Sequence, residues 1–319
     1  MKRILYVVHR YAPFPGGSEN NVRCMAEETL RRGHVAAVFA GEHMGDYNGV
    51  RVSSDPNILL ERWDLIVVHG ATVGVQDFVL SNYHNIPSPI LFLLILPKEA
   101  PIHDFAIEHI PYIGCSTYED WEFLSSKQAT HKGVQFSYGI DVENTIGTSG
   151  FREKYNITSK YMFLSCGGFW QNKAMPELVE VFNQLERDDV TLVLTGYDNR
   201  SGLMPPSTDR VKSIMLESRD DVLSAISEAD LYIMHSHSEG FGLVILEAML
   251  NNTPWVARNI AAARLLSDHG FAYNTDAELL YYMREFKGVS PEVLHANRNF
   301  VLANHSIRNT VDSILGVCK

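Results

Sequence analysis

The sequence has little cysteine, and what it has is scattered. The four cysteines are widely spaced and form no CxxC pair, so neither a zinc site nor a disulfide framework is indicated. They are Cys24, Cys115, Cys166 and Cys318. This distribution favours reduced thiols and a cytoplasmic protein.

Long hydrophobic runs are also missing. A membrane helix needs about 18 consecutive apolar residues, whereas the best candidate, residues 90–96, is only long enough for a strand and is bracketed by prolines. Near the start, His9 and Arg10 interrupt the first apolar run before it reaches the length of a secretory signal. We therefore expect no stable insertion in a membrane.

Basic residues are outnumbered. Lysine and arginine total 27 against 38 aspartates and glutamates, which gives a formal net charge of -11. Such a balance opposes broad electrostatic binding to nucleic acid or anionic lipid. The chain of 319 residues, 45% of them hydrophobic, is long enough for two domains, each with its own core.

Apolar runs alternate with amphipathic stretches along the whole chain, which is typical of repeated βα units and parallel sheets. Strands are predicted near residues 4–8, 35–40, 65–69, 90–94, 112–115 and 134–137, and in a second series near 162–166, 191–195, 213–216, 231–235 and 255–257. Helices are predicted over 19–32, from 176, 220 and 241, and twice within 291–317. A turn-rich stretch over 139–159 separates the two series.

This pattern predicts an α/β protein with two Rossmann-like domains whose parallel sheets face a central cleft. We expect a first domain over residues 1–145 and a second over 146–300. The terminal helix, within 301–319, is expected to pack towards the first domain.

The most informative segment runs from Glu239 to Glu247. The glycines at 240 and 242 give backbone freedom where a strand passes into a helix, and the helix start offers N–H groups to a diphosphate. If the whole segment is helical, the two glutamates are roughly 12 Å apart along the axis. They would then contact different parts of one extended ligand, Glu247 the ribose and Glu239 the sugar. The alternative is a solvated helix start with two incidental acids.

The segment resembles the E-x7-E motif of retaining GT-B glycosyltransferases of family four, and other motifs follow in the same order as in that family. These are Pro15-Gly16-Gly17-Ser18-Glu19, Gly33-His34-Val35, Tyr138-Gly139-Ile140-Asp141, Cys166-Gly167-Gly168 through Lys173, Glu247-Ala248-Met249 and Thr253-Pro254-Trp255-Val256-Ala257. The resemblance covers nearly the whole chain. It implies a GT-B fold with an acceptor-side domain over residues 1–145 and a nucleotide-sugar-binding domain over 146–300. It also implies retention of anomeric configuration and transfer without a metal ion.

The resemblance also implies a set of ligand-binding residues. Lys173 is expected to neutralise the leaving diphosphate. The expected nucleotide-sugar site comprises Gly16, Gly17, Gly167, Gly168, Lys173, Glu239, Gly240, Phe241, Gly242, Leu243, Val244 and Glu247. The sequence departs from the family in two places of this site: family members commonly carry arginine where Gly168 stands, and Ala174 replaces the second glycine of the motif. Arg200, Arg258 or Arg264 could supply the missing charge.

The acceptor side is expected to use histidine. His69 comes at the end of the strand predicted over 65–69, where an imidazole can orient or deprotonate an acceptor hydroxyl, although a structural histidine is equally compatible with the pattern. Relatives often carry a further histidine at a position that reads 95–99 here, and His103 is the nearest one. His235 and His237 are two residues apart at a strand end, which points them to opposite faces and opposes joint metal binding.

The predicted function is transfer of a sugar from a nucleoside-diphosphate sugar, with UDP or GDP as carrier, to an acceptor hydroxyl, with Glu239, Lys173 and His69 as the catalytic residues. No tightly bound cofactor and no metal site are expected. The acceptor is open between a glycan, a lipid-linked sugar and a modified DNA base, and the oligomeric state is open as well. The alternatives are a catalytically inactive nucleotide-sugar-binding protein and a GT-B epimerase or phosphorylase.

Overall fold

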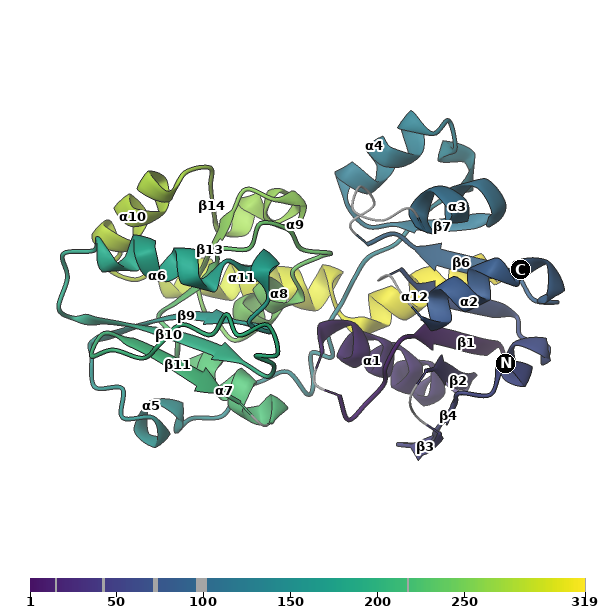
Figure 1. The fold of residues 1–319 in the computed structure, drawn as a ribbon, viewed down its shortest axis with the longest axis horizontal. Helices are drawn as coiled ribbons and strands as arrows, with labels where there is room; N and C mark the ends of the chain where they lie inside the picture. Colours follow the sequence, from purple (N-terminus) through teal and green to yellow (C-terminus); the bar gives the residue numbers. More distant parts are fainter. Residues whose placement is uncertain (15, 42–43, 71–73, 96–101, 217, 319) are drawn as a thin grey trace. The chain divides into compact units, whose positions relative to one another are not determined.

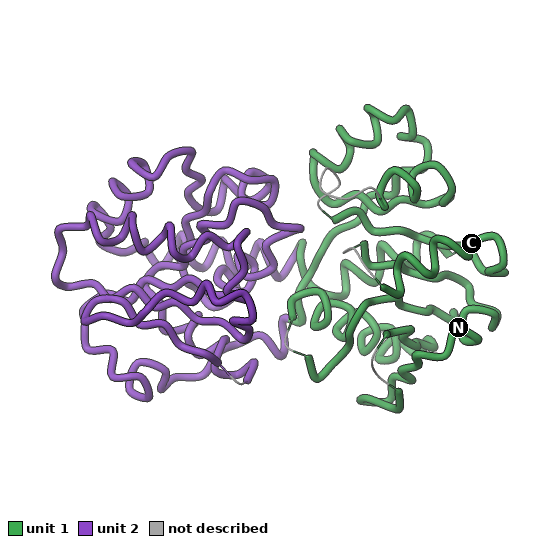
Figure 2. The backbone as a smooth tube through the Cα atoms, viewed as in Figure 1, with its two compact units in different colours: residues 1–141, 304–319 green, residues 142–303 purple. Residues whose placement is uncertain are grey.

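The chain folds into two compact units, shown in different colours in Figure 2. Unit 1 comprises residues 1–141 and 304–319, and unit 2 comprises residues 142–303. The structure is a computed structural model, and it describes the chain except for residues 15, 42–43, 71–73, 96–101, 217 and 319. The unit bounds differ by a few residues from the predicted boundaries after 145 and 300.

Unit 1 is built around an eight-stranded sheet in the order β3-β4-β2-β1-β5-β6-β7-β8. Its strands are β1 (Arg3–Val8), β2 (Val35–Ala40), β3 (Gly45–Tyr47), β4 (Val50–Ser53), β5 (Leu65–His69), β6 (Ile90–Leu93), β7 (Tyr112–Cys115) and β8 (Gly133–Gln135). Its helices are α1 (Gly17–Arg31), α2 (Val75–Ser81), α3 (Ile102–His109), α4 (Tyr118–Ser126) and α12 (Ile307–Val317). All the strand pairs described are parallel except β3 with β4.

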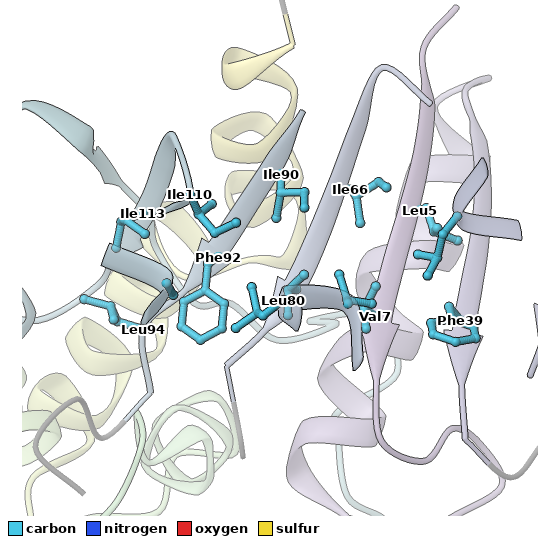
Figure 3. Close-up of a cluster of buried hydrophobic side chains, with 14 of the residues drawn as sticks. Leu5, Val7, Phe39, Ile66, Leu80, Ile90, Phe92, Leu94, Ile110 and Ile113 are labelled. Atoms are coloured by element: carbon cyan, nitrogen blue, oxygen red, sulfur yellow. The ribbon is translucent and has the colours of Figure 1, made fainter. Parts of the chain in front are cut away.

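Both faces of the central part of this sheet are buried, which explains why strands β1, β2, β5 and β6 are largely apolar rather than alternating. Leu5 and Val7 of β1 point into a core that includes Phe92 of β6 and Leu80 of α2 (Figure 3). On the other face Tyr6 reaches α1, and its hydroxyl lies 2.7 Å from Oγ1 of Thr29. The central strand is thus covered on both sides.

The C-terminal helix α12 belongs to unit 1 although it follows unit 2 in the chain (Figures 1 and 2). It packs on α1 and buries Val311 and Ile314 completely. Backbone bonds fix its entry, because the Ile140 N–H donates to His305 over 2.9 Å and the Ile307 N–H donates to Ile140 over 2.8 Å.

Unit 2 contains a six-stranded sheet in the order β11-β10-β9-β12-β13-β14, and every strand pair described in it is parallel. The strands are β9 (Tyr161–Cys166), β10 (Val190–Gly196), β11 (Val211–Met215), β12 (Leu231–Met234), β13 (Trp255–Arg258) and β14 (Phe271–Tyr273). The helices are α5 (Phe151–Lys154), α6 (Met175–Asn183), α7 (Arg219–Glu228), α8 (Leu243–Leu250), α9 (Ala261–Leu265), α10 (Asp276–Glu285) and α11 (Pro291–Asn304).

The predicted strands are all present, and three further ones were not predicted. Strand β14 is short, and β3 and β4 form a hairpin at one edge of the unit 1 sheet. A signal for the hairpin was available, because Asn48-Gly49 is the dipeptide that a two-residue hairpin turn prefers and both residues have positive φ.

Each sheet reverses its direction of winding beside its first strand. In unit 2 the chain moves outward from β9 through β10 to β11, then returns to the other side of β9 as β12. In unit 1 the same reversal lies between β1 and β5. The loops that leave the carboxyl ends of such a strand pair diverge, and ligands of open α/β sheets bind in the crevice between them. These two places position the candidate site residues.

Candidate functional site

Lys173 and Glu239 meet at the point where the unit 2 sheet reverses. Lys173 comes from the loop after β9 and Glu239 from the loop after β12, and Nζ of the lysine lies 2.5 Å from Oε1 of the glutamate. The Ser236 hydroxyl donates to the same oxygen over 2.6 Å. The loops are also joined by the His237 N–H, which donates to the Asn172 carbonyl over 2.8 Å. Two predicted site residues 66 positions apart are therefore in direct contact.

The pair carries charge in a largely enclosed position. Burial lowers the pKa of Lys173, but the adjacent Glu239 carboxylate raises it by more, so the pKa lies above the ordinary value and the ammonium is charged. The lysine side chain is 20% exposed and the glutamate side chain 13%, which leaves both partly accessible to a ligand. An ammonium in such a place can stabilise a negative leaving group more strongly than it would in water.

The glycines after β9 make room for large neighbours. Gly167 has a φ of +152°, and a Cβ there would lie 3.2 Å from Cε of Lys173. A Cβ at Gly168 would lie only 2.1 Å from Nε1 of Trp170. The indole therefore fills the space that the first atoms of an arginine side chain would need at position 168. Arg200 lies over the same indole at 5.5 Å and is paired with Asp198.

Helix α8 starts later than predicted. It begins at Leu243, with Gly242 as N-cap at a φ of +71°, instead of at Phe241. Glu239 therefore lies in the turn that precedes the helix, and the helical spacing expected between Glu239 and Glu247 is wrong. Gly240 lies in this turn, Phe241 is buried, and Leu243 and Val244 form the first turn, whose N–H groups have no partners within the helix.

Glu247 lies on α8 with its side chain only 4% exposed. Its Oε1 accepts a hydrogen bond from Nη2 of Arg219, the first residue of α7. Oε2 has no hydrogen-bond partner among the residues that the structure describes. Arg219 was not predicted as a site residue, since nothing in the sequence links positions that are 28 residues apart in two different helices.

A thiol lies beneath this part of the site. Cys166, the last residue of β9, is buried, and burial together with the nearby Glu247 raises its pKa to about 12. It is therefore a neutral packing residue at pH 7, in contact with the Tyr232 hydroxyl. Cysteine reactivity depends on the thiolate, so this residue is inert.

In unit 1, the two adjacent glycines open helix α1. Gly16 is the N-cap and Gly17 the first helical residue. A Cβ at Gly16 would lie 2.0 Å from Oε2 of Glu19, so the glycine lets this carboxylate fold back over the helix start. Burial raises the pKa of Glu19, and its own backbone N–H and Arg10, 3.3 Å away, partly offset that effect. Pro15, which precedes these glycines in the motif, lies outside the described residues.

His69 is the last residue of β5 and is almost fully buried. Burial lowers its pKa to about 4, so the imidazole is neutral at pH 7. Within the described part of the chain its Nδ1 has no hydrogen-bond partner. A neutral, weakly basic imidazole is better suited to bind a hydroxyl than to remove its proton.

The other histidines have different positions. His103 is buried on α3 and packs edge-on against Phe92, while residues 96–99 lie outside the described part of the chain. His235 is buried, and Nη2 of Arg258 donates to its Nε2 over 2.8 Å, whereas His237 is half-exposed beside Glu177. Burial and Arg258 lower the pKa of His235 to about 4. The described residues contain no cluster of three or more His, Cys, Asp or Glu side chains placed to hold a metal ion.

Part of the sequence matches known proteins. Residues 160–283, in unit 2, match the family model described as glycosyl transferases group 1. A D-inositol 3-phosphate glycosyltransferase from Salinispora tropica is 29% identical over 145 residues, and the match covers 37% of this chain. The chain spans only 30% of that relative's length.

Solved structures resemble the whole chain. HepE from Anabaena, solved in complex with UDP and glucose, has a TM-score of 0.78 at 18% identity, with 99% of each chain covered. Sucrose-phosphate synthase from Thermosynechococcus elongatus has a TM-score of 0.77 at 14% identity, covering 99% of this chain and 98% of its own.

The predicted fold class is confirmed: the protein has the two-domain GT-B fold. The match of its second unit to the glycosyl transferases group 1 model agrees with the resemblance that the sequence motifs indicated. Among the helices that the structure describes, none combines the length and the apolarity needed to cross a bilayer.

Proposed function

We propose that this protein is a glycosyltransferase that moves a sugar from a nucleoside-diphosphate sugar to an acceptor hydroxyl with retention of configuration. The observation that carries the proposal is the contact of Lys173 with Glu239, 2.5 Å apart, at the switch point of the unit 2 sheet. The match of this unit to glycosyl transferases group 1 and the complexes of HepE with UDP and glucose support it.

The bound donor places its diphosphate at Lys173 and the start of α8, where an ammonium and helix N–H groups stabilise the leaving charge without a divalent ion. Glu239 binds the sugar, and Glu247 binds the ribose. The bond between the anomeric carbon and the diphosphate oxygen breaks while the acceptor oxygen forms a bond to the same face of that carbon. The acceptor proton passes to the departing phosphate oxygen, and His69 binds the acceptor hydroxyl.

UDP-glucose is the first donor to test, because it is the ligand of the HepE complexes, and GDP-sugars are the second. A glycan, a lipid-linked sugar and a modified DNA base are the acceptor classes to test. We place the reaction in the cytoplasm, since Cys24, Cys115 and Cys166 are buried thiols outside any disulfide, as in proteins of reducing compartments.

A second candidate is a nucleotide-sugar-binding protein without transfer activity. The observation that favours it is Trp170, whose indole occupies the space of the arginine that the family commonly uses beside Lys173. A site with one cation instead of two binds its donor but stabilises the leaving group less.

The two candidates are separated by measuring UDP release from UDP-sugars over an acceptor panel, in buffer with EDTA. We expect transfer by the wild type, with a fall in kcat of about 100-fold or more for Lys173→Met and for Glu239→Gln. Lys154→Met, which removes a surface cation of α5, is the control and keeps the wild-type rate. Tight donor binding without turnover over the whole panel would support the inactive protein instead.

A further inference from the structure

The ion pair between Arg219 and Glu247 goes beyond the roles already given to the site residues. We propose that Arg219 is a positioning residue for the donor nucleotide: it holds one oxygen of Glu247 so that the other oxygen meets the ribose hydroxyls. This inference rests on the proposed function, since it needs a nucleotide at Glu247. It assigns the recognition of the ribose to two helices, α7 and α8, instead of to Glu247 alone.

The two oxygens of the Glu247 carboxylate have different surroundings. Oε1 accepts from Nη2 of Arg219, while Oε2 is buried and lacks a partner among the described residues. A buried carboxylate oxygen without a hydrogen bond is destabilising, so a protein keeps one where a ligand supplies the donor. A ribose diol carries two hydroxyl donors and fits that need.

The arginine is placed to control this carboxylate. It is the first residue of α7, and the start of that helix is fixed by the Ser218 hydroxyl, which accepts the Asp221 N–H over 3.1 Å. Its side chain is 34% exposed against 4% for Glu247, so the guanidinium lies on the solvent side of the pair. The fixed geometry of a guanidinium orients a carboxylate more strictly than a lysine ammonium does.

The pair also lies at the same strand end as the diphosphate residues. Cys166, which ends β9, interacts electrostatically with Glu247, Arg219 and Lys173. Lys173 is in turn 2.5 Å from Glu239. Both ion pairs therefore lie near the carboxyl end of β9. A single nucleoside diphosphate can then contact Lys173 with its phosphates and Glu247 with its ribose.

The test is calorimetric titration of the full-length protein with UDP and with 2′,3′-dideoxy-UDP, which lacks both ribose hydroxyls. We expect Arg219→Met to weaken UDP binding about 10-fold and to leave dideoxy-UDP binding near the wild-type value. Arg219→Lys should weaken UDP binding less, by about 3-fold. In a Glu247→Gln background, Arg219→Met should cause little further loss of UDP affinity. If the wild type prefers another base, the corresponding pair of diphosphates is used.

Lys154→Met is a matched control, because Lys154 of α5 pairs over 2.7 Å with Asp221 of α7, the helix that begins with Arg219. It should bind both nucleotides as the wild type does. Unchanged UDP affinity in Arg219→Met would overturn the inference, as would an equal loss for both nucleotides. If the methionine variant does not fold, the lysine variant decides by the same comparison. Failure of the wild type to bind any nucleoside diphosphate would instead refute the proposed function.

Discussion

Glu239 and Glu247 each lie against a basic side chain, Lys173 in one case and Arg219 in the other. An isolated charge at these depths would be costly, and the basic partner of each glutamate offsets part of that cost. A ligand that contacts Lys173 and the second carboxylate oxygen of Glu247 therefore binds to groups that are already ordered. Such pre-organisation lowers the entropic cost of binding.

The contact of Trp170 with Gly168 leads to a prediction on stability. Gly168→Arg should lower the free energy of unfolding by about 1–3 kcal/mol, because the new side chain overlaps the indole. The same change in a Trp170→Ala background should cost clearly less, since the space is then open. Urea denaturation of the four proteins measures this coupling, and equal costs in both backgrounds would show that the indole does not block position 168.

His69 predicts a dependence of stability on pH. Burial lowers its pKa from 6.5 to about 4, so between these values the unfolded chain binds more protons than the folded one. The stabilisation from the neutral imidazole is complete above pH 6.5 and is lost as the pH falls towards 4. From pH 7 to pH 5 the wild type should lose about 2 kcal/mol through this residue.

His69→Gln, which does not titrate, should lack that part of the loss. Urea unfolding of both proteins at pH 7 and pH 5 gives the comparison, and the other titrating groups cancel because both proteins share them. If the free energy of unfolding falls equally in the wild type and in His69→Gln, the pKa of His69 is the same in the folded and unfolded states.

The sequence predicted that Lys173 and Glu239 belong to one candidate site, but it did not predict their direct contact. Lys173 and Glu239 could be named from motifs, since both follow strands that end at one sheet edge. Their direct pairing depends on the conformations of two loops, and the role of Arg219 depends on how α7 packs beside α8. Neither is encoded in a local pattern, because the partners are far apart in the chain.

At the level of secondary structure, Ala174 occupies a position with glycine geometry. It is the N-cap of α6 and has a φ of +51°, in the left-handed region that disfavours side chains. This backbone conformation explains why the family motif has a glycine at this position. The sequence alone could not show the conformation. Here the strained residue connects Lys173 to α6.

Replacing this residue by glycine should have little net effect on stability. Ala174→Gly relieves the strain but loses a buried methyl group, so the free energy of unfolding should change by less than about 1 kcal/mol. Ala248→Gly, within α8 and equally buried, should lose more than about 1 kcal/mol, since no strain is relieved there. Chemical denaturation compares the two, and an equal loss would mean that the left-handed backbone carries no cost.

On the scale of the whole molecule, the two units differ in how the chain builds them. Unit 2 is continuous, whereas unit 1 needs residues from both sides of it. Helix α12 buries Ile307, Val311 and Ile314 in unit 1, which contributes roughly 5 kcal/mol and so matches the stability of a typical domain. Alternating strands and helices predicted two domains, and the terminal helix was expected to return to the first.

A fragment of residues 142–303 should therefore fold cooperatively and melt at a higher temperature with UDP, whereas a fragment of residues 1–141 should not fold stably. Joining 1–141 to 304–319 through a short glycine-serine linker should restore folding, because Ile140 and Ser306 are already paired. Thermal unfolding followed by circular dichroism tests all three. A stable 1–141 fragment would show that α12 is dispensable.

The late return of α12 has a consequence for synthesis on the ribosome. At roughly 5–20 residues per second, unit 2 takes many seconds to be made, and throughout this time unit 1 waits with the surface that α12 will cover exposed to water. The second unit can reach its native state first. In the cell, the first domain would be completed only after residues 304–319 emerge.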